Sequence, residues 1–507
     1  MCYVVPTLHP PGCAVRRCAL RRCPALAYVR LVARGTLLGA LCGLFPSASG
    51  ATDFSIGDPF KTERYVAPAP GTRWQPFEAL PKVEDPSRVS MPARDRPLSL
   101  PELTELALQN NPKTRQAWHA ARAVAAGIGI EKSDDLPQIS ASATFQRSES
   151  GGQAGNQIAW LTRYGPAVTL SYLLYDFGAG DSRVKAAEYL ALAAALAQNR
   201  VLQEVVFQVE QAYYVYLGTE ALVRSNELFL KSVRTSLDAT QRRREAGLAT
   251  IADVYRAETQ VAQAQLNLTR SRGGLEKARG SLASAVGLPI NAALKIQTIE
   301  GEPRIKEISE SLQAMLDRAK AGRSDLVAAE AQARAARAQA DAKAKDGLPT
   351  LTLNATTGRT FFYQDRPFTE TNLLLLNLNI PLFTGFNHTY SMRQAEARAA
   401  QAEASRDVLY RQTELEVWQS YYDVQTAVGG ISTTAVQLKA AQQTAEATLA
   451  RYQAGFGSLL DLITAQVDES NARVQRIQSF LDWFTAVGRL NYSIGASDNT
   501  AYSVQTR

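Results

Sequence analysis

The sequence predicts a mainly α-helical protein with a membrane β-barrel portion, built as two structural repeats that each contain a long helical hairpin plus two barrel strands. Three observations predict this fold class. Residues 178–246 contain no proline and, beyond Gly178 and Gly180 at the start, a single glycine, Gly218, so they predict one helix on the order of 100 Å long. A stretch of the same kind follows about 208 residues later. Short segments of alternating apolar and polar residues precede each long stretch.

The first long helix is expected to end at Gly247. Glycine just past a helix end adopts the left-handed conformation without steric cost. Thr250, followed three residues later by Asp253, predicts a capping box that starts the next helix. The chain therefore turns sharply at Gly247 and returns as a second helix over about residues 253–286.

The sequence pattern of this turn recurs at residues 451–461. Gly455 corresponds to Gly247, and Ser458 with Asp461 predicts a second capping box. Two unrelated helices of similar composition would need the same turn chemistry at the same offset twice. The repeat instead indicates two similar halves, which we place at residues 98–287 and 311–492.

The first 50 residues read as a secretory signal peptide that is removed near residue 49 or 50. They contain all five cysteines and six arginines, with no acidic residue before Asp53, and an apolar run at 35–45 precedes small residues at 47–51. Removing this segment lowers the net charge from +7 to +1. The positive charge that would favour nucleic-acid binding therefore belongs to the signal peptide. The exported part has no cysteine, which excludes disulfides and thiolate catalysis. Residues 51–97 are rich in proline and predict an extended segment.

Four segments predict strands: 138–146, 168–175, 350–356 and 374–382. An apolar face opposite a Ser/Thr/Asn face is typical of outer membrane barrels. A soluble β-sandwich with one solvent-exposed face would show the same alternation. Aromatic residues gather in the hairpins, as in interfacial girdles: Trp160, Tyr164, Phe361, Phe362, Tyr363 and Phe368. Since about eight strands are the smallest closed barrel and an open edge is not tolerated in lipid, several chains are expected to share one barrel that their helices continue as a tube.

The shorter helices fit this arrangement. Residues 100–132 and 253–286 are each about half as long as the long helix, so two can stack end to end beside it. The second repeat is expected to do the same with helices near 311–346 and 459–488. Residues 288–310 predict a linker around the middle of the tube, and 493–507 a C-terminal tail.

Paired strand-to-helix junctions at 174–178 and 381–385, and paired turns around Gly247 and Gly455, resemble those of the TolC-like outer membrane factor family. Asn110-Asn111-Pro112, with a weaker echo at 323–326, is also similar, and the resemblance covers about residues 98–492. It implies a homotrimer with a 12-stranded outer membrane barrel continued by a 12-helix periplasmic tunnel. Members dock on a periplasmic adaptor and an inner-membrane pump or ABC transporter, and export small toxic compounds or unfolded proteins.

The resemblance also implies roles for individual residues. Asp461 would belong to an acidic ring that constricts the tunnel entrance, and Tyr452 would hold the inner hairpin shut by bonding to Asp253. The turns at Gly247 and Gly455 would dock the adaptor. Two positions depart from the family pattern: Gly457 replaces an arginine clamp, and Thr464 replaces a second ring aspartate. Helix capping is the alternative role for both aspartates.

The leading functional reading is the outer membrane exit channel of a tripartite export system, embedded in outer membrane lipids and extending into the periplasm. A non-conducting trimeric periplasmic coiled-coil structural protein is the alternative. We expect neither an enzyme nor a cofactor, because no nucleophile–base set, phosphate loop or metal-ligand spacing is visible. The sequence does not indicate the cargo or the class of pump.

Overall fold

The computed structural model describes residues 96–148, 160–292, 294–298, 310–363 and 367–496. They all lie within the unit Pro86–Arg507. The predicted signal peptide, nearly all of the proline-rich segment, residues 299–309 of the linker and the tail from residue 497 lie outside the described residues.

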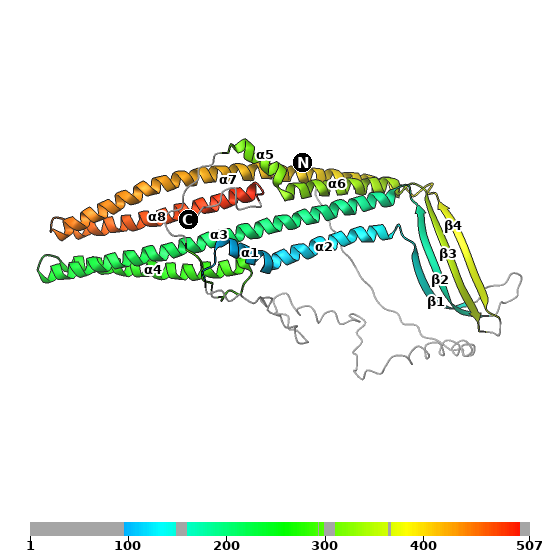
Figure 1. Cartoon of the computed structure of the whole chain (residues 1–507), viewed down its shortest axis with the longest axis horizontal. Helices are drawn as coiled ribbons and strands as arrows, with labels where there is room; N and C mark the ends of the chain where they lie inside the picture. The colour runs from blue at the N-terminus through cyan, green and yellow to red at the C-terminus, as the bar shows by residue number, and fades with distance from the viewer. Residues whose placement is uncertain (1–95, 149–159, 293, 299–309, 364–366, 497–507) are drawn as a thin grey trace, which may run out of the picture. The chain divides into compact units, whose positions relative to one another are not determined.

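Two helices of equal length dominate the unit (Figure 1). Helix α3 (Ala179–Glu245) and helix α7 (Asn387–Gln453) each contain 67 residues. The first residues of the two helices are 208 positions apart in the sequence, and so are their last residues. Helix α4 (Ile251–Val286) returns beside α3, and helix α8 (Leu459–Ser493) returns beside α7. The two predicted hairpins are therefore present, with α8 continuing five residues beyond its expected end.

The helix expected over 100–132, with an interruption at Asn110-Asn111-Pro112, is present as two helices, α1 (Leu100–Asn110) and α2 (Pro112–Ser133). The break falls at Asn111, whose extended backbone is the conformation that a following proline favours. The second repeat breaks at Arg323 without a proline, between α5 (Leu312–Gly322) and α6 (Ser324–Lys345). Both α2 and α6 pack along α3. None of the described helices has an apolar stretch long enough to span a bilayer.

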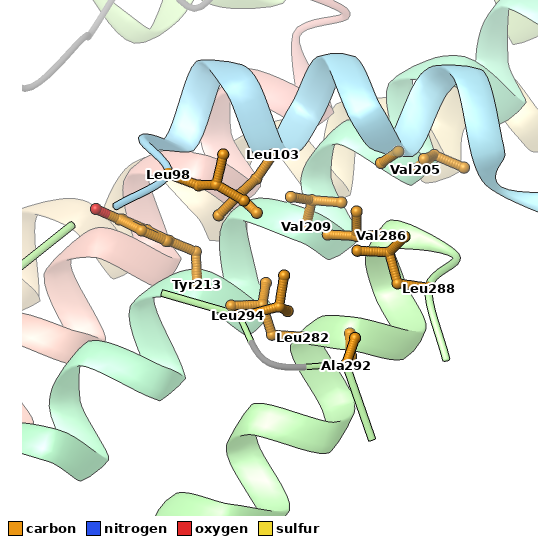
Figure 2. Close-up of a cluster of buried hydrophobic side chains, with 12 residues drawn as sticks. Leu98, Leu103, Val205, Val209, Tyr213, Leu282, Val286, Leu288, Ala292 and Leu294 are labelled. Atoms are coloured by element: carbon orange, nitrogen blue, oxygen red, sulfur yellow. The ribbon is translucent and has the colours of Figure 1, made fainter. Parts of the chain in front are cut away.

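The main apolar core lies where the short helices meet. Figure 2 shows this cluster in the first repeat, where Leu103 of α1, Val209 of α3 and Val286 of α4 are fully buried. The same three positions of the second repeat hold Met315, Val417 and Ile494, which are also buried together. The described part of the linker joins the first cluster through buried side chains: Leu288, Ala292 and Leu294.

The strands form one antiparallel sheet in the order β1 (Gln138–Ser148), β2 (Leu161–Tyr175), β3 (Thr350–Phe362) and β4 (Thr369–Asn379). Several predicted bounds were wrong. Strand β2 begins seven residues earlier than expected, and β4 is displaced toward its hairpin. Gly165-Pro166 lies before the expected start of this strand, yet it pairs with Thr144 and Ala143 of β1. Glycine is needed there, because a β-carbon on Gly165 would lie 1.8 Å from the Arg359 carbonyl oxygen.

Aromatic side chains form a row near the hairpin end that crosses β1, β2 and β3 and finishes at Phe368, just before β4. Phe145 lies opposite Tyr164, and Tyr164 opposite Phe361. The Phe361 ring is 5.7 Å from that of Tyr164 and 6.0 Å from that of Phe368. Six residues further along each strand, and therefore on the same face, lies a row of apolar side chains: Ile139, Leu170, Ala355 and Leu374. An apolar band bordered by aromatic residues is the pattern of a lipid-facing barrel surface.

Candidate gate and docking turns at the helical tip

The two hairpin turns have the backbone that the sequence predicts. Gly247 has φ +74° and Gly455 has φ +84°, both in the left-handed region. The following residues close the turns, since the Leu248 amide donates to the Arg243 carbonyl at 2.7 Å and the Phe456 amide to the Arg451 carbonyl at 3.0 Å. A β-carbon on either glycine would meet nothing within 4 Å, so the backbone conformation alone requires glycine.

Each turn presents an apolar side chain at its apex. Leu248 is 68% exposed and Phe456 is 83% exposed. Ile251, Tyr255 and Leu460 on the adjoining helix starts are also exposed. Large apolar side chains gathered at an exposed end are typical of a contact surface, which fits the docking role expected for these turns.

The two expected capping boxes differ. Thr250 and Asp253 form a complete box: the Asp253 amide donates to the Thr250 hydroxyl at 3.2 Å, and the Thr250 amide donates to the Asp253 carboxylate at 3.0 Å. The hydrogen bond from the Thr250 side chain, followed by that from its backbone, lowers the pKa of Asp253. In the second repeat the Asp461 amide donates to Ser458 Oγ at 3.1 Å. The reciprocal bond is not formed, so that box is half complete.

Asp461 therefore keeps its carboxylate free of hydrogen bonds within the described chain. Its side chain is exposed on the first turn of α8. Thr464, one turn further, is exposed on the same face. A free carboxylate there is compatible with an acidic ring, and it makes no capping hydrogen bond within the described chain.

Tyr452 is buried, with 4% exposure, and contacts both α3 and the first turns of α4. Its side chain packs with Ala257, Leu459, Leu462 and Ile463. Its hydroxyl lies 3.0 Å from Oγ1 of Thr240. The expected hydrogen bond to Asp253 is not formed within the described residues: the Tyr452 hydroxyl bonds to Thr240, and the Asp253 carboxylate accepts from Thr250.

Sequence reasoning missed the polar contacts that join α3 to the α7–α8 hairpin. The Gln466 amide group on α8 donates to the hydroxyls of Ser232 at 3.0 Å and Ser236 at 2.9 Å. Ser232, Ser236 and Thr240 are spaced four residues apart, so they lie in one line along α3. That spacing is visible in the sequence, but hydroxyls on a helix also bond to their own backbone, so the pattern alone does not reveal a contact.

A buried charged cluster at the break between α5 and α6 was also missed. Arg323, only 2% exposed, donates two hydrogen bonds to Asp325, at 3.0 and 2.6 Å, and one to Glu416 at 2.6 Å. Arg200 of α3 adds an ion pair to Asp325 at 3.4 Å and lies over the Tyr492 ring at 3.6 Å. The cluster joins α3, α6, α7 and α8 near the middle of the long helices.

The family model described as outer membrane efflux protein matches the chain twice, over residues 103–288 and 315–496. These ranges coincide closely with the two repeats. Each match begins in the first short helix of a repeat and ends just after its last helix.

Individual relatives agree with this match. Protein CyaE of Bordetella pertussis is 29% identical over 388 residues, covering 75% of this chain and 80% of that protein. The toluene efflux pump outer membrane protein TtgF of Pseudomonas putida is 26% identical over 447 residues, covering 83% and 90%. The solved outer membrane protein VceC of Vibrio cholerae is 21% identical with a TM-score of 0.69, covering 78% and 96%; at that identity it shows a shared fold.

Proposed function

This chain belongs to the outer membrane efflux protein family, and we propose that three copies of it form the exit duct of a tripartite export system. The other members of the system would be a periplasmic adaptor and an inner-membrane pump or ABC transporter. The sheet would lie in the outer membrane and the helices in the periplasm.

One observation supports an assembly of several copies above all others. The sheet has four strands, and its outer strands β1 and β4 have no neighbour within the described chain. Unpaired edges in lipid leave backbone amides and carbonyls without partners, each at a cost of several kcal/mol. Three copies would supply 12 strands and close the barrel, which is well above the smallest size of about eight.

The tip residues receive proposed roles in this duct. Three copies of Asp461 around a threefold axis would form a negatively charged ring at the entrance, and rings of this kind select cations. The exposed turns at Gly247 and Gly455 would dock the adaptor. Tyr452 would hold its hairpin against α3 when the entrance is closed.

The assembly is tested by the mass of the detergent-purified protein and by its conductance in planar bilayers. We expect a trimer that conducts ions. A stable soluble monomer would contradict the duct, and a trimer without conductance would favour a structural coiled-coil protein. Leu376→Arg, on the apolar face of β4, should abolish membrane insertion, because arginine on a lipid face costs about 2–4 kcal/mol near the midplane. Asn377→Arg, one residue away on the opposite face, is the matched control and should insert.

The cargo class has its own test. Deleting the gene and assaying both drug susceptibility and secreted protein separates small-molecule efflux from type I secretion. Increased susceptibility would indicate efflux, and loss of a secreted polypeptide would indicate secretion.

A further inference from the structure

A single ion pair interrupts the face of the sheet that carries the aromatic and apolar rows. Between the aromatic row and the helical end of the described strands, the only charged side chains on this face are Arg359 of β3 and Glu370 of β4. They are cross-strand partners. Arg359 comes two residues before Phe361 of the aromatic row, so it lies about 7 Å closer to the helices along the strand. Because aromatic belts lie at the level of lipid headgroups, this pair lies where headgroups meet hydrocarbon, and charges there need polar partners.

Neither member of the pair uses all of its hydrogen-bonding groups. Arg359 contacts a single oxygen of Glu370, Oε1, through Nε at 3.1 Å and Nη2 at 2.9 Å. Nη1 of Arg359 and Oε2 of Glu370 have no partner within the described residues, and the two side chains are 59% and 51% exposed. The pair can therefore donate to an anion at one end and accept from a cationic N–H group at the other.

A second polar pair lies one row closer to the helices. Thr357 is opposite Asn372 on the same two strands, and its hydroxyl donates to the Asn372 side-chain oxygen at 2.7 Å. The side-chain nitrogen of Asn372 makes no hydrogen bond within the described part of the chain. Since Asn372 is exposed, its two N–H groups are available to an acceptor outside the sheet.

These four polar side chains line one end of a groove on this face. A hollow of about 300 Å³ lies between them and residues 166–168 of β2. A second hollow of about 380 Å³ shares Val168, Thr357 and Asn372 with the first, so the two are continuous. The second is lined mainly by the apolar row: Ile139, Leu170, Ala355 and Leu374. We call the two hollows together the sheet groove. A polar end that continues into an apolar end matches the shape and polarity of a lipid.

We propose that the sheet groove binds a zwitterionic phospholipid, with the headgroup at the polar end and an acyl chain along the apolar row. Arg359 donates to the phosphate, as guanidinium groups do in phosphate recognition, and Asn372 donates to a second oxygen of the lipid. Glu370 accepts from the lipid ammonium group. A headgroup that is only anionic fits less well, because the Glu370 carboxylate would repel it. The inference goes beyond the proposed function, since it requires the sheet to lie in the membrane but does not require the duct to conduct.

The test identifies the lipid that stays bound to the detergent-purified protein by native mass spectrometry. The protein is incubated with equal amounts of phosphatidylethanolamine and phosphatidylcholine that have the same acyl chains. Both headgroups carry the phosphate, but only the first has N–H groups for Glu370. The wild type should retain phosphatidylethanolamine in about tenfold preference, which is the effect of one hydrogen bond to a charged group. A second mixture replaces phosphatidylcholine with phosphatidylglycerol, which has the phosphate and no ammonium group.

Two variants separate the two ends of the headgroup. Glu370→Gln should abolish the preference for phosphatidylethanolamine, because it removes the acceptor charge. Arg359→Gln should lower retention of both lipids, because it removes the phosphate contact. Arg163→Gln is the matched control. Arg163 lies at the same end of the sheet on the opposite face, where it donates to Gln146 at 2.9 Å, so retention and preference should match the wild type.

The outcomes distinguish a lipid site from an ion pair that only joins two strands. A preference that Glu370→Gln loses and Arg163→Gln keeps supports the site. Equal retention of the first two lipids by the wild type overturns it, and so does stronger retention of phosphatidylglycerol than of phosphatidylethanolamine. If Arg359→Gln and Glu370→Gln melt lower in lipid-free detergent but retain lipids as the wild type does, the pair is only structural and the proposal fails. A wild type that conducts without lipid preference overturns the site and leaves the duct intact.

Discussion

Gly287 lies directly against the backbone of Asn111, at the break between α1 and α2. A β-carbon on Gly287 would lie 2.8 Å from Asn111 Cα and 2.9 Å from its amide nitrogen. Gly287 also has φ +80° as the C-cap of α4, and the Asn111 side-chain amide donates to the Ala285 carbonyl at 2.9 Å. The end of α4 is thereby fixed to the joint between the two stacked helices. The second repeat has the same relationship, between Gly495 and Arg323.

Gly287→Ala should lower the melting temperature of the protein markedly. A left-handed alanine costs about 1–2 kcal/mol, and the clash with fixed backbone adds a similar amount. Gly273→Ala, inside α4 with nothing within 4 Å of its β-carbon, is the control. It should be neutral or stabilising by up to about 1 kcal/mol. Equal melting of the two variants would show that the contact with Asn111 is unimportant.

The charged cluster around Arg323 predicts a loss of stability in acid. Burial alone would raise the pKa of Asp325, but the hydrogen bonds from Arg323 and the charge of Arg200 outweigh it and lower that pKa below 3.8. A carboxylate whose pKa is lowered by folding stabilises the protein above its unfolded pKa, and this contribution disappears as the pH falls through the folded value. The relevant window therefore lies below about pH 4.

Asp325→Asn should cost about 3 kcal/mol near pH 7, because it leaves the buried Arg323 short of one anionic partner. The difference in melting temperature from the wild type should shrink below about pH 4. Asp407→Asn removes a carboxylate from an exposed pair with Arg406 and should change melting little at any pH, since surface pairs contribute about 0–1 kcal/mol. A difference between Asp325→Asn and the wild type that stays constant with pH would argue against this role.

The sequence predicted the helical ends better than the strands, for a physical reason. Gly247 and Gly455 mark helix ends through local backbone chemistry, so α3 and α7 end within one or two residues of the expected positions. The strand bounds depend on partners far along the chain. Pro166 lies opposite Ala143 of β1, at a place where β2 and β3 have no pair within the described strands, so its missing N–H breaks no ladder there. Nothing near Pro166 in the sequence reveals that.

In the candidate site, too, the features set by neighbouring residues were predictable and the contacts between distant segments were not. The turn glycines and the Thr250–Asp253 box involve residues within seven positions of one another, and all were predictable. The partner of Tyr452 depends on how α3 and α7 align, with Thr240 and Arg243 more than 200 residues away in the chain. A family resemblance indicated Asp253 instead, whose carboxylate is already bound to Thr250.

The tip turns predict a docking defect that leaves the barrel intact. Gly247→Val or Gly455→Val should strain the left-handed backbone by about 1–2 kcal/mol or more and reshape the exposed apex. We expect normal outer membrane insertion with reduced crosslinking to the adaptor and reduced export. Gly429→Val, inside α7 with open space around its β-carbon, is the control and should dock normally. Normal export and crosslinking in both turn variants would mean that the adaptor docks elsewhere.

The free carboxylate of Asp461 gives the sharpest test of the entrance. Asp461→Asn removes the charge but keeps the backbone amide that binds Ser458. It should reduce cation preference, measured as the reversal potential in a salt gradient, with no change in melting. Asp253→Asn is the matched contrast, because that carboxylate closes the capping box on Thr250. It should lower the free energy of unfolding by about 0.5–2 kcal/mol. The reversal potential should stay unchanged. If Asp461→Asn leaves the reversal potential unchanged, Asp461 does not line the conducting path, and the negative ring must be sought elsewhere on α8.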